Sequence, residues 1–238
     1  MRRLFNGLVD LLFPPRCIAC MNVLTDDDRP PFCRPCLAAI RFVRSPLCTR
    51  CGAPFEGTGE DHLCGDCLSA PPAFTIARSV ARYESALLTS IHRFKYGGKT
   101  AVGKALGRFM ARHPAPGLRI EAYTLVIPVP LDVGRLRERE FNQALILAGE
   151  LARPARRPVD AVSLTRRRGT DPQVRLGRDE RRKNIRGAFA VTRPDRIAGR
   201  KILLVDDVYT TGSTVGECAR VLMDHQAEAV AVLTLARA

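Results

Sequence analysis

The sequence predicts an α/β domain with a parallel sheet, preceded by a small cysteine-rich module. Ile202 to Val205 form an apolar run without alternation, which is typical of a strand buried on both faces of a parallel sheet. An acidic pair, a hydroxyl-rich loop and a stretch with helical spacing follow this run. Eight of the nine cysteines lie in the first 67 residues. We therefore predict a metal-binding module over residues 1–70 and the α/β domain over residues 71–238.

The N-terminal segment predicts a short amphipathic helix within the first module. Leu4, Leu8, Leu11 and Leu12 share one helical face. We favour packing of this face on the body of the protein, with peripheral membrane contact as the alternative. Polar residues interrupt the apolar core that a signal peptide needs, and no run of about 18 apolar residues occurs. We expect a cytoplasmic protein without a transmembrane segment.

The charge balance predicts an anionic partner. The chain of 238 residues carries a formal net charge of +14 and has a pI near 10.0. Such a balance suits nucleic acid, a membrane surface or phosphorylated small molecules. Aromatic residues make up only 6% and Trp is absent, which argues against an extended base-stacking platform.

The cysteines form four C-x-x-C pairs arranged as an internal repeat. Twelve residues separate the first pair from the second, and twelve separate the third from the fourth. Two such pairs close a tetrahedral four-thiolate site, which is typical of structural zinc. The predicted ligands of two structural zinc ions are Cys17, Cys20, Cys33, Cys36, Cys48, Cys51, Cys64 and Cys67.

Two alternatives stay open for this module. A disulfide framework has the same cysteine count, but nothing in the sequence indicates secretion. The repeat favours sequential pairing of the first four and the last four cysteines, although crossed pairing is an alternative. Residues 26–31 are polar and proline-rich, so we expect folding here to depend on zinc. The module has three candidate roles: nucleic-acid contact, partner contact, or a lid over the second domain.

The sequence of the second domain predicts alternating strands and helices. The predicted strands cover residues 74–83, 125–127, 159–164, 187–191, 202–205 and 229–235. Predicted helices cover an apolar stripe from Leu87 to Phe94 and residues 101–112. Between them lies a basic, glycine-rich stretch. Lys95 or Lys99 there either stabilises a helix C-terminus or reaches an anionic substrate.

An arginine cluster follows the strand that ends in Pro-Val-Pro. Arg135, Arg137 and Arg139 crowd the start of a predicted helix that extends to Leu151, with Leu136 on its apolar face. Cations at a helix start oppose the helix dipole. An external anion such as pyrophosphate would favour them, and a solvated face is the alternative.

A strongly basic segment covers residues 166–186. Its nine Lys and Arg residues against three acidic ones give a net charge of +6 (nine minus three). The segment is either a solvated loop, a loop that closes over a phosphate-rich substrate, or a track for the backbone of a single nucleic-acid strand.

The stretch after the Ile202–Val205 strand carries the strongest chemical signal. Asp206 and Asp207 stand at the carboxyl end of this strand, where ligands bind in open α/β sheets. The loop that follows enters a helix, so its backbone N–H groups and hydroxyls form an anion site. An anion site beside two carboxylates suits a phosphate next to a sugar diol, with the carboxylates acting directly or through a divalent cation. The predicted loop ligands are Thr210, Thr211, Gly212, Ser213 and Thr214.

These residues resemble the phosphoribosyl-pyrophosphate signature of type I phosphoribosyltransferases. The resemblance implies that Asp206 and Asp207 hold the ribose hydroxyls and that residues 210–214 hold the 5′-phosphate. In that family the loop after the strand corresponding to residues 125–127 contacts pyrophosphate.

The order of motifs along the whole chain resembles the ComF family. It runs through the four cysteine pairs, KYGGK, PVP with RLRER-x-FNQA, the basic segment, and LLVDDVYTTGST. The resemblance implies a competence-associated protein that handles incoming single-stranded DNA. Glu140 stands where the family usually has glycine, which would stiffen that turn.

Two functions follow as hypotheses. In the first, a binding module holds phosphoribosyl pyrophosphate and engages single-stranded DNA or an uptake helicase. In the second, an active phosphoribosyltransferase of nucleotide or nucleoside metabolism uses Mg²⁺ to displace pyrophosphate, with Asp206 and Asp207 as the catalytic pair and an acceptor that the sequence does not identify. A purely structural zinc scaffold ranks last because it leaves the acidic pair unexplained.

Overall fold

A four-stranded parallel sheet lies at the centre of the computed structural model, which describes residues 14–25, 31–167 and 185–238. Its strands follow the order β1 (Ile76–Arg82), β6 (Ala229–Arg237), β5 (Lys201–Tyr209) and β2 (Leu125–Pro128). All three pairings are parallel, as the unbroken apolar run from Ile202 to Val205 predicts. The predicted N-terminal amphipathic helix, most of the polar 26–31 stretch and most of the basic segment lie outside the described residues.

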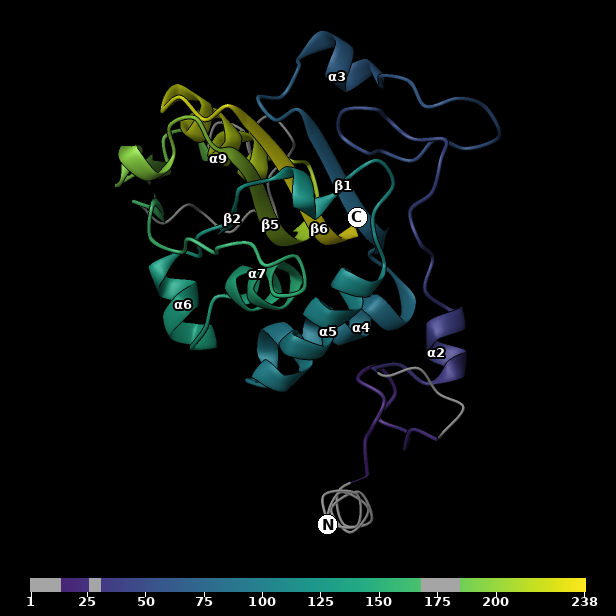
Figure 1. The fold of residues 1–238 in the computed structure, drawn as a ribbon. Coiled ribbons are helices and arrows are strands. Elements are labelled where there is room, and N and C mark those ends of the chain that lie inside the picture. The colour runs from purple at the N-terminus through teal and green to yellow at the C-terminus, as the bar shows by residue number, and fades with distance from the viewer. Residues whose placement is uncertain (1–13, 26–30, 168–184) are drawn as a thin grey trace.

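Helices cover both faces of the sheet (Figure 1). One face packs against α4 (Ser85–Tyr96), α5 (Thr100–Arg112) and α7 (Gln143–Ala152). The other face packs against α9 (Ser213–Asp224) and a short antiparallel hairpin. This hairpin pairs β3 (Leu164–Arg166) with β4 (Phe189–Val191), so the basic segment predicted from the sequence begins and ends at it.

The strand predicted over residues 159–164 is wrong for most of its length. Val159 makes a single bridge to Val126, and strand β3 begins only at Leu164. The side chain of Asp160 accepts hydrogen bonds from the backbone N–H groups of Val162 and Ser163, both at 2.9 Å. A local side-chain acceptor therefore turns the chain where the apolar pattern predicted extension.

The single helix predicted through the arginine cluster is also wrong. Glu140 adopts a left-handed conformation (φ 65°) and ends α6 (Val133–Arg139), after which Asn142 caps α7. The predicted core residue Leu136 is 41% exposed. The arginines belong to α6, two of them in its last turn, where cations are favourable to the dipole. The dipole argument for an external anion therefore fails.

The cysteine-rich module packs directly on the second domain. Its short helices α2 (Arg34–Ala38) and α3 (Gly65–Ser69) each begin immediately after the first cysteine of a C-x-x-C pair. Phe32 contacts Phe109 of α5 edge to face, with ring centroids 5.1 Å apart. Two 3₁₀ helices, η1 (Ile120–Ala122) and η3 (Pro194–Arg196), complete the described elements. Within the described ranges, no helix has the length and apolar character needed to cross a membrane.

Candidate functional site

The eight predicted ligand cysteines form two separate four-thiolate clusters. The first zinc centre comprises Cys17, Cys20, Cys33 and Cys36, and the second comprises Cys48, Cys51, Cys64 and Cys67. In each cluster the four sulfur atoms lie within 4.8 Å of one another, so the pairing is sequential and not crossed.

Sulfur distances within both clusters fit tetrahedral zinc. The Cys20 and Cys33 Sγ atoms lie 3.6 Å apart, and those of Cys51 and Cys64 lie 3.7 Å apart. A Zn–S bond of about 2.3 Å in tetrahedral geometry requires sulfurs about 3.8 Å apart. The backbone N–H groups of Cys51 and Cys64 both donate to Cys48 Sγ at 3.4 Å, as expected around a zinc-bound thiolate. With four protein ligands each, both are closed structural zinc sites.

A pocket of about 230 Å³ opens at the carboxyl ends of β2 and β5. We call it the sugar pocket, after the phosphosugar that the sequence predicts as a ligand. Its lining includes seven of the predicted site residues, namely Asp206, Asp207, Thr210, Thr214, Lys95, Arg135 and Arg139. The chain thus brings residues more than a hundred positions apart to one cavity, as the parallel topology requires.

Four predicted site residues lie elsewhere. Arg137 is exposed on α6 and does not line the sugar pocket. Thr211, Gly212 and Ser213 line a neighbouring cavity of about 490 Å³, which we call the outer cavity. Thr210 lines both, so residues 210–214, the phosphate loop, separate the two cavities.

The carboxylates of Asp206 and Asp207 lie on different sides of the sugar pocket. Successive residues of β5 point to opposite faces of the sheet. Asp207 lies toward α4, where its Oδ2 atom is 3.0 Å from Lys95 Nζ. Asp206 lies partly buried on the other side, within electrostatic reach of Arg166. The pocket therefore wraps around the end of a single strand.

Electrostatics distinguish the two acids further. Burial, together with the neighbouring Asp207 charge, raises the pKa of Asp206 to about 7. Burial opposes the charge on Lys95, but the Asp207 carboxylate outweighs it and the pKa of Lys95 is raised. At neutral pH Lys95 is thus charged, whereas the pKa of Asp206 lies close to neutrality.

The phosphate loop has the backbone that an anion site needs. Gly212 takes φ 77° immediately before α9, and the Thr211 and Ser213 hydroxyls lie 2.9 Å apart. A Cβ atom at position 212 would lie 2.2 Å from Tyr209 Oη, so only glycine fits there. Beyond it, α9 begins, and the backbone N–H groups of a helix start suit an anion; the Ser213 N–H donates to Thr211 Oγ1 at 3.4 Å.

Several residues that surround Arg139 or line the rest of the sugar pocket were not predicted as site residues from the sequence. Arg139 donates to Gln143 Oε1 at 3.2 Å, and its guanidinium lies 5.3 Å from the Tyr96 ring centroid. Gln143 is 2% exposed, and in the described part of the chain its Nε2 atom has no hydrogen-bond partner. The remaining polar lining residues that were missed are Tyr83, Asn142 and Arg166. The FNQA string contains Asn142 and Gln143, the basic segment contains Arg166, and no motif in the sequence marked Tyr83.

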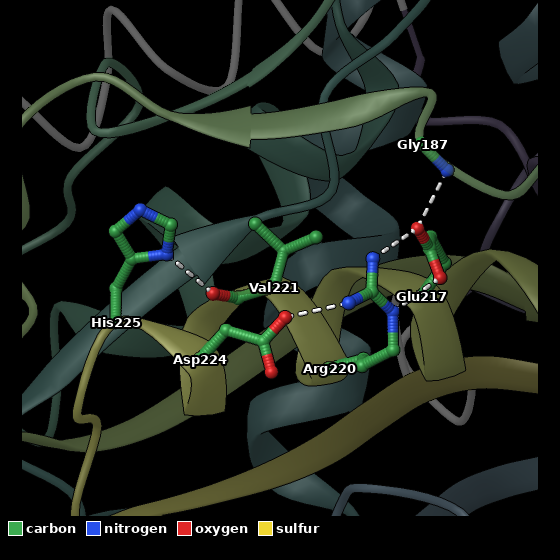
Figure 2. Close-up of polar contacts among 6 residues, drawn as sticks. All are labelled: Gly187, Glu217, Arg220, Val221, Asp224 and His225. Carbon is green, nitrogen blue, oxygen red and sulfur yellow. Dashed lines mark hydrogen bonds and ion pairs between the residues drawn. The ribbon is translucent and has the colours of Figure 1, made fainter.

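Helix α9 also anchors the chain just after the basic segment. Figure 2 shows the carboxylate of Glu217 accepting from the Gly187 backbone N–H at 2.7 Å and from Arg220, which also pairs with Asp224. Hydrogen bonding from Arg220 is the main reason that the pKa of Glu217 is lowered. The same helix thus begins at the phosphate loop and holds the end of the predicted basic segment (Figure 2).

Comparison with known proteins identifies two matching domains. Residues 8–68 match the double zinc ribbon domain, and residues 142–238 match the phosphoribosyl transferase domain. DNA utilization protein YhgH from Escherichia coli K12 is 35% identical over 209 residues, covering 86% of this chain and 89% of that protein. Competence protein F from Haemophilus influenzae is 30% identical over 227 residues, covering 94% of this chain and 97% of the relative.

Among solved structures, the glutamine phosphoribosylpyrophosphate amidotransferase from Bacillus subtilis, complexed with ADP and GMP, aligns with a TM-score of 0.41 and 18% identity. The alignment covers 67% of this chain and 31% of that chain.

Proposed function

This chain belongs to the ComF family of competence proteins, and from that premise we propose that its sugar pocket binds phosphoribosyl pyrophosphate together with Mg²⁺. One observation carries the proposal. Two carboxylates, the start of α9 and two of the three α6 arginines line a single cavity of about 230 Å³. That volume lies below the usual range for drug-sized ligands and suits a pentose with phosphates.

Each side of the pocket has a distinct part in this proposal. Asp206 and Asp207 accept the ribose hydroxyls, and their oxygens are the ligand type that Mg²⁺ prefers. The phosphate loop, of which Thr210 and Thr214 line this pocket, binds the 5′-phosphate through backbone N–H groups and hydroxyls. Arg135 and Arg139 of α6, which also line the pocket, bind the pyrophosphate group. Bound Mg²⁺ supplies charge neutralisation of the pyrophosphate.

We propose further that the protein handles single-stranded DNA in the cytoplasm. The net charge of +14 supports binding to a polyanion, and similarity to a competence protein and a DNA utilization protein supports DNA as that polyanion. A DNA-uptake helicase is the protein partner we would test first. Backbone-directed binding of this kind weakens steeply as salt rises.

Active phosphoribosyl transfer is the second candidate function. In that reaction a nucleophile forms a bond to C1 of the ribose, the C1–O bond to pyrophosphate breaks, and the nucleophile loses its proton. The specific observation in favour is that the pKa of Asp206 is raised to about 7, which suits a group that accepts a proton at neutral pH.

Titration calorimetry tests the binding proposal. With Mg²⁺ present, the full chain should bind phosphoribosyl pyrophosphate and ribose 5-phosphate, and Asp206→Asn should weaken both. Asp195→Asn is the matched control, because Asp195 is an exposed acid on η3 away from the pocket. An absence of binding heat with either ligand in the wild type would refute the proposal.

Two further measurements separate the candidate functions. Pyrophosphate release across a panel of bases is expected only for a transferase. Single-strand binding that survives Asp206→Asn favours a binding module with independent DNA contacts. Joint loss of DNA binding and sugar binding in that variant would instead tie the DNA to the sugar pocket.

A further inference from the structure

Two arginines of the parallel sheet lie beside the second zinc centre. Arg78 of β1 is 5% exposed and donates to the carbonyl oxygens of Cys48 and Thr49 at 3.4 and 3.2 Å. Arg237 of β6 donates to the Cys51 carbonyl oxygen at 2.8 Å, with Cys51 Sγ 3.9 Å away. Four thiolates around one Zn²⁺ carry a formal charge of −2, so the two guanidinium groups offset that charge.

Arg237 also lines the outer cavity, next to the phosphate loop. Its guanidinium lies 4.4 Å from the centroid of the Tyr209 ring, within the range of a cation–π interaction. Tyr209 is the last residue of β5 and is buried. Arg237 therefore contacts the second zinc centre on one side and the strand that leads into the phosphate loop on the other.

The Tyr209 ring in turn packs against the phosphate loop at Gly212. A Cβ atom built at Gly212 would lie 2.6 Å from Tyr209 Cζ, so the ring lies directly against the Gly212 backbone. Displacement of the ring would change the path of the loop at its left-handed residue. The four groups form one continuous line of contact: Cys51, Arg237, Tyr209 and Gly212.

The cysteines of the first zinc centre are not among these four contacting residues. Cys17 and Cys33 belong to the core on the side of α4 and α5. Cys48, Cys51 and Cys67 belong to the other core, together with Tyr209 and α9. The two zinc centres thus pack on opposite faces of the sheet, and only the second shares a core with the phosphate loop's supporting residue.

We propose that Arg237 is a positioning residue that couples the second zinc centre to the phosphate loop. Bound zinc holds Cys51 in place, Cys51 orients the guanidinium, and the guanidinium fixes the Tyr209 ring under Gly212. Affinity for a sugar phosphate then depends on the second zinc centre and not on the first. This coupling rests on the proposed function for its ligand, a 5′-phosphate bound at residues 210–214.

The test compares Arg237→Met with Arg41→Met, an exposed arginine of the first module, in the full chain. Cys64→Ser and Cys36→Ser disrupt the second and first zinc centres, respectively. Four quantities are measured: zinc content, affinity for ribose 5-phosphate, affinity for inorganic pyrophosphate, and amide hydrogen exchange of residues 210–214.

Arg237→Met should retain two zinc ions per chain yet bind ribose 5-phosphate about tenfold more weakly. Its affinity for pyrophosphate, which in the proposed function binds at Arg135 and Arg139, should stay within about twofold of wild type. Exchange of residues 210–214 should accelerate in Arg237→Met and Cys64→Ser, but not in Cys36→Ser or Arg41→Met.

Wild-type exchange and wild-type affinity for ribose 5-phosphate in Arg237→Met would overturn the coupling. Equal weakening of both ligands would also overturn it, because a purely structural role for Arg237 predicts that result. If wild-type protein binds neither ligand, the proposed function fails, and the hydrogen exchange comparison alone decides the coupling.

Discussion

Replacing Asp206 with asparagine should make the protein more stable while it loses sugar binding. Burial and the adjacent Asp207 charge raise the pKa of Asp206 to about 7, so the folded state favours its protonated form. Above that pH the folded protein must carry a partly desolvated charge that the unfolded chain carries in water. Asparagine is neutral and still offers an oxygen to the Asp207 N–H, which donates to Asp206 Oδ1 at 2.8 Å.

The pKa shift sets the size and the pH window of the effect. A change from 3.8 to about 7 corresponds to at most about 4 kcal/mol, at about 1.4 kcal/mol per pH unit. Since Asp206 is only partly buried, we expect about 2 to 4 kcal/mol at pH 8.5. A raised carboxyl pKa means that wild-type stability is complete below the unfolded value and declines as pH rises toward the folded value. The advantage of the variant should therefore grow from about pH 4 and level off near pH 7 to 8.

Urea unfolding of both proteins at pH 5 and pH 8.5 measures this difference. Asp207→Asn is the matched control, because it leaves the Lys95 ammonium, 3.0 Å from Asp207 in the wild type, without its anionic partner. That variant should lose about 2 to 3 kcal/mol. Two neighbouring carboxylates should thus respond in opposite directions. An Asp206→Asn advantage that is absent at pH 8.5, or that is the same at both pH values, would refute the reasoning.

Three further predictions concern the backbone and the metal. Glu140→Gly should raise the free energy of unfolding by about 0.5 to 1 kcal/mol, because glycine takes the φ of 65° without strain; an unchanged urea midpoint would contradict this. Gly212→Ala should abolish calorimetric binding of ribose 5-phosphate and lower the melting temperature, because its Cβ would overlap Tyr209; wild-type affinity would show that the loop is not constrained as described. Chelation should remove two zinc ions per chain and expose aromatic side chains such as Phe32, measured by metal release and dye binding; retention of wild-type melting after full zinc removal would contradict a structural role.

The zinc ligands and the signature strand were predictable because their chemistry is local. A C-x-x-C pair turns back on itself within four residues, and an apolar run such as Ile202 to Val205 suits burial in a parallel sheet. The acidic pair and the phosphate loop follow directly from the end of that strand. Their position at the mouth of a pocket needed only the general rule for ligand sites in open α/β sheets.

Other features depend on contacts between distant residues. From helix periodicity, a single helix was predicted to continue from the arginine cluster past Glu140. No local rule forces a glutamate into the left-handed conformation that ends α6. Lys95 had two candidate roles, and only the packing of α4 against β5 placed its ammonium on Asp207.

The sequence alone thus identified the zinc ligands and predicted the acidic pair and the phosphate loop, since these patterns lie within short segments. Tertiary structure decided which face of the sheet each carboxylate serves, how cysteines pair across the repeat, and that Arg237 lies between a zinc centre and Tyr209. The physical reason is that burial and electrostatic coupling depend on neighbours in space, and sequence distance does not record those neighbours.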